Sequence, residues 1–324
     1  MRIVVAGGTG LIGTALVRRL VAEGHEIDLL TRRLPVHAGL LPVGVRATVW
    51  DAKNVGSWSS VIDGADAVIN LAGESIGSRR WTSSQKAKVV GSRVNATGAI
   101  VAAMKESPRP PATLINGSAI GFYGHVTSGD VIEEAPRGAG FLAVTTEQWE
   151  IEALRAREYG TRVVVLRTGL VLAPGGGALQ RMLVPFRLCV GGTLGSGLQW
   201  VSWVHREDVV GAILHCLLTP GLSGPVNVVA PDPHTMKQFC AALGTTIRRP
   251  SWLPVPAFAL RLALGEMSEV VLSGQRVVPL RLQQSGYRFR YPLLAGALSE
   301  VVGGKKMTPF KRFPPKATEC RSHE

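Results

Sequence analysis

The strongest constraint on the fold is a glycine-rich turn at the start of the chain. Gly7, Gly10 and Gly13 have the spacing G-x-x-G-x-x-G, directly after an apolar segment at 2–6 and directly before a helical pattern at 13–23. Glycines at these places allow a tight turn, let backbone amides approach a pyrophosphate, and let the helix pack close to a sheet. The pattern predicts a dinucleotide site at the amino end of this helix. A tight turn without a ligand is the alternative, because glycines mark turns of many kinds.

Segments typical of strands and helices alternate over the first half of the chain. Strand patterns lie at 2–6, 25–30, 45–50, 67–71, 112–116 and 162–167, and helical patterns lie at 13–23, 84–105 and 145–158. This order predicts an α/β fold with a doubly wound parallel sheet of the Rossmann type. A later helix is expected at 205–218, with Asp208 as a cap near its start.

We expect the chain to have three parts. The first is a dinucleotide-binding domain at 1–247, which includes insertions around a substrate cleft. The second is a smaller, partly helical substrate module at 248–302. The third, at 303–324, is rich in basic residues and proline and has little apolar periodicity, so it is expected to be a disordered tail.

The end of the second expected strand distinguishes between the two pyridine nucleotides. An NAD site usually has an acidic residue there, about 20 residues after the glycines, which accepts hydrogen bonds from the ribose 2′-hydroxyl. Here Thr31 and Arg32 take that place, and Asp28 lies too early, inside the strand. A guanidinium and a hydroxyl suit a 2′-phosphate, so we predict NADP(H) in preference to NAD(H). The alternative is a solvated basic pair formed by Arg32 and Arg33.

Two further strand ends carry residues that suit the same ligand. Asp51 follows the third expected strand, where a carboxylate can accept from an adenine amino group, and Leu71, Ala72 and Gly73 end the fourth, where small residues leave room beside the backbone. Because the carboxyl ends of parallel strands meet at one edge of a sheet, we predict that both segments line one cleft. Each is otherwise an ordinary exit from strand to loop.

The chain is strongly basic, with a formal charge of +13 and a pI of about 10.2. Six basic and two acidic residues at 305–324 account for +4 of this charge. The sequence has no zinc finger, helix-turn-helix or aromatic RNA-binding signature, so we expect no specific nucleic-acid partner.

Composition also limits the cellular setting. With 46% hydrophobic and 18% charged residues, the chain is not a disordered polyelectrolyte. It has no apolar run of the about 18 residues that a spanning helix needs, so no membrane partner is expected. Its four cysteines form neither a C-x-x-C pair nor a metal-binding spacing, which favours a reducing compartment and no metal. Without a signal-peptide pattern before the glycine turn, we expect a cytoplasmic location.

Motifs that recur in one enzyme family lie at 7–13, 63–73, 167–172 and 203–209. They resemble the extended short-chain dehydrogenases/reductases of the NAD(P)-dependent epimerase/dehydratase type. Further segments resemble an atypical subgroup that has a C-terminal domain of unknown function; they lie at 254–256, 265–267, 273–276 and 285–292. The resemblance covers about residues 1–302.

The resemblance implies which residues lie along the dinucleotide. Those nearest the turn and the strand ends are Gly7, Gly10, Leu11, Ile12, Gly13, Thr31, Arg32, Leu71 and Ala72. Arg93, on the helix after the fourth strand, and Val171, beyond the sixth, are implied as well. An ordinary surface cation is the alternative for Arg93.

The usual catalytic residues of this family are missing. The family uses a Ser or Thr and a Tyr-x-x-x-Lys pair, in which the lysine lowers the tyrosine pKa from about 10. No Tyr-x-x-x-Lys occurs here: Ala119 stands at the Ser/Thr position, and Leu142 and Thr146 stand at the Tyr and Lys positions. Ser118 and Tyr123, after the fifth expected strand, are the catalytic candidates, and a packed loop aromatic is the alternative for Tyr123.

Other side chains are weaker candidates. Alternative proton donors are His125 and Glu147, and an apolar substrate wall is one interpretation of Trp200, Trp203 and Trp252. Buried structural tryptophans are the commoner case. His205 is expected to cap or pack rather than to act as a base.

These observations predict an NADP(H)-binding, epimerase-family oxidoreductase that acts on an unidentified small carbonyl or sugar-like substrate. The alternative is an NADP(H)-binding sensor or scaffold with little or no turnover, because the nucleotide half of the site is complete and the catalytic half is not. A homodimer is one option for the assembly.

Overall fold

A computed structural model describes residues 1–33 and 43–303 of the chain. The expected tail at 303–324 therefore lies, apart from its first residue, outside the described residues. Within the described parts, no helix is both long enough and apolar enough to cross a membrane.

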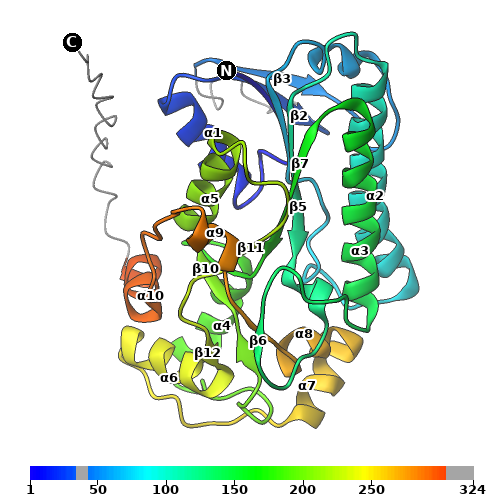
Figure 1. The fold of residues 1–324 in the computed structure, drawn as a ribbon. Helices are drawn as coiled ribbons and strands as arrows, with labels where there is room; N and C mark the ends of the chain where they lie inside the picture. The colour runs from blue at the N-terminus through cyan, green and yellow to red at the C-terminus, as the bar shows by residue number, and fades with distance from the viewer. Residues whose placement is uncertain (34–42, 304–324) are drawn as a thin grey trace, which may run out of the picture.

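A seven-stranded parallel sheet forms the centre of the molecule (Figure 1). Its strands are β11 (Gly224–Val228), β7 (Arg162–Thr168), β5 (Thr113–Ala119), β4 (Ala67–Asn70), β1 (Arg2–Ala6), β2 (Glu26–Thr31) and β3 (Val45–Val49), in that spatial order. The order reverses at β1, which pairs with β2 on one side and β4 on the other. This is the doubly wound arrangement that the sequence predicts, and it places a ligand cleft at the carboxyl ends of the central strands.

Helices cover both faces of the sheet. Figure 1 shows α1 (Gly13–Ala22) and α5 (Arg206–Leu218) on one face, and α2 (Ser83–Glu106) and α3 (Phe141–Leu154) on the other. Strands that are covered on both sides read as unbroken apolar runs, and Ile3–Ala6 is fully buried for that reason. Short 3-10 turns η2 (Ser57–Val61), η3 (Ile120–Tyr123) and η4 (Arg155–Tyr159) join these elements.

The remaining elements form a distal lobe beyond the carboxyl ends of the strands, at the end of the molecule opposite the N-terminus (Figure 1). Its helices are α4 (Gly177–Arg187), α6 (Met236–Ile247), α7 (Ala257–Leu264) with the 3-10 turn η5 (Gly265–Ser268), α8 (Glu269–Leu272) and α10 (Leu294–Gly303). Short strands link it to the main sheet and to α9 (Leu280–Gln284): β6 (Asp130–Val131), β8 (Leu170–Leu172), β9 (Trp200–Val201), β10 (Trp203–His205), β12 (His234–Thr235) and β13 (Arg276–Val277).

One hydrophobic cluster joins α4, α6 and α10. It contains Leu183, Phe239 and Leu298, all buried. The last helix thus shares its core with residues before 247, and the expected boundary between 247 and 248 falls inside this shared core. Those domain limits stay a prediction.

Two local expectations from the sequence are wrong. Helix α5 is capped by His205, whose Nδ1 accepts from the Glu207 amide at 3.2 Å, and not by Asp208. Asp208 is buried and accepts from the amides of Arg290 and Tyr291 at 2.6 and 2.9 Å, a partnership across about 80 residues that no local pattern reveals. Strand β5 also continues to Ala119 along β7, so Ser118 lies in the strand and not after it.

Candidate functional site

The glycine turn between β1 and α1 has no room for side chains at two positions. Gly7 has a φ of +77°, and a Cβ there would lie 2.5 Å from the Leu71 carbonyl carbon. A Cβ at Gly13 would lie 2.3 Å from the Gly7 oxygen. Both distances are far below a normal contact, so the close approach of β1, β4 and α1 depends on these glycines.

The amino end of α1 is open to an anion. Its N-cap is Ile12, which offers no capping side chain, and its first turn contains no acidic residue. Gly10 is exposed, and a Cβ there would meet only the Gly7 oxygen, at 3.3 Å. The first amides of a helix carry a partial positive charge, and none of the described residues caps or neutralises it with a side chain at this end. The Leu11 side chain lies against the turn at Gly176.

The carboxyl end of β4 is held in place by buried amides. Asn70 is fully buried, and its Nδ2 donates to Asn116 Oδ1 at 2.7 Å while its Oδ1 accepts from the Ala72 amide at 3.1 Å. The Leu71 amide donates to the Ala6 carbonyl at 2.9 Å. This network fixes the backbone of Leu71 and Ala72 beside the glycine turn. That the segments of Asp51 and of Leu71, Ala72 and Gly73 line one cleft stays a prediction.

Arg93 reaches this edge from α2. Its Nη1 donates to the carbonyls of Glu74 and Val89, both at 3.0 Å, and a Cβ on Gly73 would lie 3.2 Å from its guanidinium carbon. The side chain is partly buried, and burial lowers its pKa to about 10, which the nearby Glu74 carboxylate only partly offsets. Among the described residues no carboxylate forms an ion pair with it. Its polar partners there are backbone carbonyls, and its guanidinium also lies over the Trp149 ring, 5.2 Å from the centroid.

The end of β2 offers an arginine and no free acid. Arg32 is exposed, whereas Thr31 is buried and donates to the Arg33 carbonyl at 2.9 Å, so its hydroxyl already has an acceptor. The Asp28 carboxylate accepts from Arg2 Nε at 2.9 Å and from Arg46 Nε at 3.0 Å. Because the buried Asp28 carboxylate is already paired with Arg2 and Arg46, it is not available for a ribose hydroxyl.

A hollow of about 460 Å³ lies beside Arg32, between the end of β3 and η2. Asp51, Asn54 and Trp58 also line it. Asp51 accepts from the amides of Lys53 and Asn54 at 2.8 and 2.9 Å, and these backbone bonds hold its pKa below the usual range. The structure thus brings Arg32 and Asp51 to one hollow, with Asp51 ionised and partly engaged by its own loop.

Ser118 and Tyr123 belong to a buried polar network. Ser118 Oγ donates to Glu150 Oε1 at 2.5 Å, and Tyr123 Oη donates to Asn227 Oδ1 at 2.6 Å. Arg167 connects them, because it donates to both Glu150 oxygens, at 2.9 and 2.8 Å, and to Tyr123 Oη at 3.0 Å. Burial raises the Tyr123 pKa to about 12. Both hydroxyl protons are therefore held by acceptors inside the protein.

The sequence singled out Ser118 and Tyr123 but assigned no role to the other members of this network. Arg167 and Glu150 form a buried ion pair, and Glu133, buried beside them, accepts from the Asn227 amide at 3.0 Å. The signal that could have found it is an arginine in the apolar strand β7, because a buried arginine needs a partner. The partners lie on other elements, so the sequence does not identify them.

The weaker candidates are spread over the molecule. His125 Nδ1 contacts the Gly274 carbonyl, and Glu147 is paired with Arg137. Trp203 is fully buried, Trp200 is half-buried and Trp252 is exposed, so the three do not form one wall. Of the remaining predicted cofactor residues, Ile12 and Val171 lie partly buried at the edge of the same hydrophobic cluster as Leu71.

Sequence comparisons point to one family. The chain matches the NAD dependent epimerase/dehydratase family over residues 3–229 and a domain of unknown function, DUF1731, over residues 255–301. It is 39% identical to the chloroplastic "Epimerase family protein SDR39U1 homolog" of Arabidopsis thaliana, over 93% of this chain and 87% of that protein. It is 36% identical to the human "Epimerase family protein SDR39U1", over 93% of this chain and 100% of that protein.

Solved structures show the same architecture. The crystal structure of human SDR39U1 (isoform 2) with NADPH has a TM-score of 0.83 and 34% identity, and the match covers 94% of this chain and 99% of that one. A nucleoside-diphosphate sugar epimerase from Corynebacterium glutamicum has a TM-score of 0.74 and 30% identity, with 94% of this chain and 58% of that chain covered.

Proposed function

Because the chain belongs to the NAD dependent epimerase/dehydratase family, we propose that it binds NADPH at the carboxyl edge of β1, β2 and β4. We further propose that it uses this cofactor in hydride transfer with an unidentified small carbonyl or sugar-like substrate. The observation that carries the proposal is the Arg93 guanidinium, which lies partly buried beside Gly73 and forms no ion pair with a carboxylate of the described residues. NADPH in the crystal structure of human SDR39U1 supports the choice of nucleotide.

The residues at this edge fit a phosphorylated dinucleotide. The crowded glycines Gly7 and Gly13 bring the backbone close enough for a pyrophosphate to meet the amides of α1. The positive charge of Arg93 would balance the negative charge of the dinucleotide. Arg32 would bind the 2′-phosphate beside the hollow that Asp51 lines. When bound, NADPH supplies the hydride.

Proton transfer is assigned to Ser118 and Tyr123. A tyrosine with a pKa of about 12 keeps its proton at neutral pH, and the Arg167 guanidinium would stabilise the phenolate after the proton leaves. The Ser118 hydroxyl donates to Glu150, whose carboxylate also pairs with Arg167.

A second candidate is an NADPH sensor or scaffold without turnover. It is favoured by the direction of two hydrogen bonds: Ser118 donates to Glu150, and Tyr123 donates to Asn227. A hydroxyl proton that is already donated in a hydrogen bond to a buried acceptor is not directly available to a substrate.

Calorimetry with NADPH and NADH tests the cofactor assignment. We expect Arg32→Glu to weaken NADPH binding by about 10- to 100-fold more than NADH binding, because a charge-assisted hydrogen bond is replaced by repulsion. Arg33→Glu makes the same charge change one residue further on and is the matched control, with a small effect. Equal losses for both nucleotides, or for both variants, would contradict the assignment.

Turnover distinguishes the two candidates. NADPH oxidation is followed by the nicotinamide absorbance over a panel of aldehydes, ketones and nucleotide sugars. For an enzyme we expect a substrate to appear, and Tyr123→Phe to lower its kcat by about 100-fold or more. NADPH binding without oxidation of any panel member supports the sensor.

A further inference from the structure

Two chain segments that build part of the distal lobe contain no acidic residue. Neither 159–206 nor 233–265 has an Asp or Glu, although both contain lysine or arginine. These two segments contribute α4, α6 and α7, which Figure 1 shows together at the end of the molecule farthest from the N-terminus. The η5, α8 and α10 elements of the lobe carry Glu266, Glu269 and Glu300, so the excess of basic residues lies on α4, α6 and α7.

Large apolar side chains are exposed on the same lobe. Leu188 after α4 and Trp252 after α6 are 68% and 64% exposed. On α7, Phe258 and Leu262 are 72% and 78% exposed, and this helix buries none of its residues although all but one of them are apolar. A helix of that composition usually faces a protein core or an apolar partner.

Hydrogen bonds join the segment that follows Leu188 to the segment that contains Trp252. The Trp252 amide donates to the Gly191 carbonyl at 3.1 Å, and its indole Nε1 donates to the Cys189 carbonyl at 3.0 Å. Three residues on, the Val255 amide donates to the Thr193 carbonyl at 2.8 Å. The segment that carries Leu188 and the segment that carries Trp252 thus run side by side, and the second leads directly into α7.

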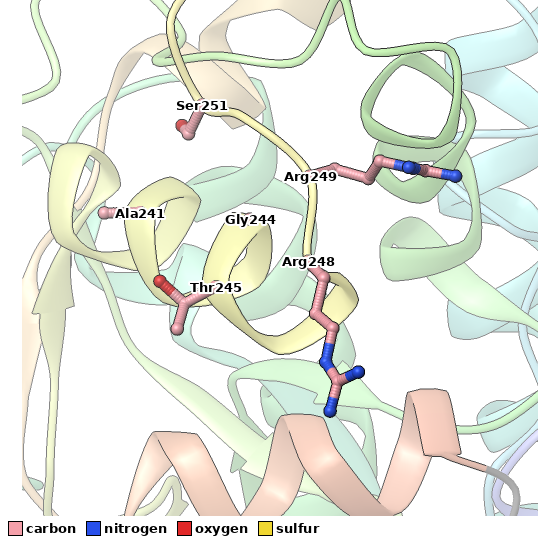
Figure 2. Close-up of a pocket in the computed structure, with 6 residues that line it drawn as sticks. All are labelled: Ala241, Gly244, Thr245, Arg248, Arg249 and Ser251. Atoms are coloured by element: carbon pink, nitrogen blue, oxygen red, sulfur yellow. The ribbon is translucent and has the colours of Figure 1, made fainter.

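Arginines and hydroxyls surround a hollow next to Trp252. The hollow measures about 330 Å³ and is lined by Thr245, Arg248, Arg249 and Ser251 at the end of α6. In Figure 2 the two guanidiniums point away from each other, with Arg248 directed toward α10. Among the described residues, no carboxylate lies within ion-pair distance of either one. Arg248 also has a φ of +55°, a conformation that favours glycine.

We propose that the distal lobe is a peripheral docking surface for an anionic lipid membrane. Exposed Trp, Phe and Leu side chains beside arginines are the combination that proteins use at a bilayer surface: the apolar groups enter the headgroup region and the guanidiniums bind lipid phosphates. The lobe has no acid in 233–265 that would repel such a surface. Docking needs no spanning helix, so this surface departs from the expectation of no membrane partner, which rested only on the lack of a long apolar run.

Two other occupants fit less well. A second copy of this chain, related by twofold symmetry, would bring Arg248 and Arg249 against residues 236–265 of its partner, which contain no acid to pair them. A nucleic acid would use the arginines but would leave Leu188, Phe258 and Leu262 without an apolar partner.

Vesicle flotation with the full chain tests the proposal. We expect binding to vesicles of equal phosphatidylglycerol and phosphatidylcholine, no binding to phosphatidylcholine alone, and release as salt is raised. Phe258→Ser with Leu262→Ser should weaken binding by about tenfold or more without a change of charge. Arg248→Gly should weaken it by about fivefold, while its melting temperature stays the same or rises, because glycine suits the positive φ. Val144→Ser with Ile151→Ser on α3 also exposes two fewer apolar groups, and is the matched control with no expected effect.

The controls separate the lobe from nonspecific charge. A full-length variant with Lys305, Lys306, Lys311 and Arg312 changed to Gln should lose only part of the binding. Loss of all binding in that variant, or unchanged binding in the Phe258 and Leu262 variant, would overturn the proposal. If a DNA duplex displaced the protein from the vesicles as effectively as free vesicles do, the surface would bind a nucleic acid. If millimolar inorganic phosphate alone displaced it, the surface would bind a free anion. Either result would also overturn the proposal.

Discussion

Substitution of single glycines in the β1–α1 turn separates packing from ligand binding. In Gly13→Ala the new Cβ would lie 2.3 Å from the Gly7 oxygen and 2.5 Å from the Gly8 Cα. A carbon atom needs about 3.5 Å or more, so the turn has to move by about 1 Å. All the nearest atoms belong to the backbone, so no flexible side chain can absorb the shift.

The expected cost follows from that overlap. Overpacking of this kind costs about 1–3 kcal/mol, and a small gain in helix propensity at the start of α1 offsets part of it. A net loss of about 2 kcal/mol lowers the melting temperature by about 4 °C. Displaced amides would also lose about two charge-assisted hydrogen bonds to the pyrophosphate, which weakens NADPH binding by about 100-fold.

Gly10→Ala is the matched variant for the ligand. Its Cβ would meet only the Gly7 oxygen, at 3.3 Å, and the residue is exposed, so thermal stability should stay near that of the unaltered chain. Because the Gly10 backbone is expected to approach the pyrophosphate, NADPH binding should still fall by about tenfold or more. Thermal melting and calorimetry measure the two effects. Full NADPH affinity in Gly10→Ala, or an unchanged melting temperature in Gly13→Ala, would refute this account of the turn.

Three further predictions concern buried polar groups. Glu150→Gln leaves the Arg167 guanidinium buried without a counter-charge, so the free energy of unfolding should fall by about 3 kcal/mol or more in a denaturant titration, a much larger loss than Glu152→Gln causes in an exposed ion pair. Burial raises the pKa of Glu133 above its usual value of 4.5, so the folded state binds a proton that the unfolded chain releases in that range; stability should fall as pH rises through the window above 4.5, and Glu133→Gln should flatten the dependence of melting temperature on pH. Asp208→Ala removes the buried acceptor of the Arg290 and Tyr291 amides and should lower the melting temperature by several degrees, whereas a change below 1 °C would mean that the amides find other partners.

The sheet could be predicted, and candidates for the nucleotide edge could be named, because their signals are local. Gly7, Gly10 and Gly13 lie within seven residues, and strand and helix periods show the order of elements directly. Arg32 needs only the end of β2 to be recognised as a candidate. The comparisons confirm the family and the fold class.

The buried polar network that contains Tyr123 could not be predicted, because its members lie far apart in the sequence. Tyr123 meets Asn227 across 104 residues, and Glu133 meets the Arg281 amide across 148 residues. Pairings of that kind depend on tertiary packing, which leaves no periodic trace in one sequence. The prediction that Asp208 caps α5 was wrong for the same reason, because Asp208 accepts from the distant amides of Arg290 and Tyr291 and not from its own helix end.

The core that joins Leu183, Phe239 and Leu298 has a consequence for synthesis of the chain on the ribosome. The five strands from β1 to β5 are complete by residue 119 and can pair with one another as they emerge. The apolar side of α6 must wait for α10, which is translated after the other described helices. A nascent chain that stalls before residue 294 would present that uncovered surface to chaperones and proteases, so loss of α10 should reduce cellular abundance even where the nucleotide cleft is intact.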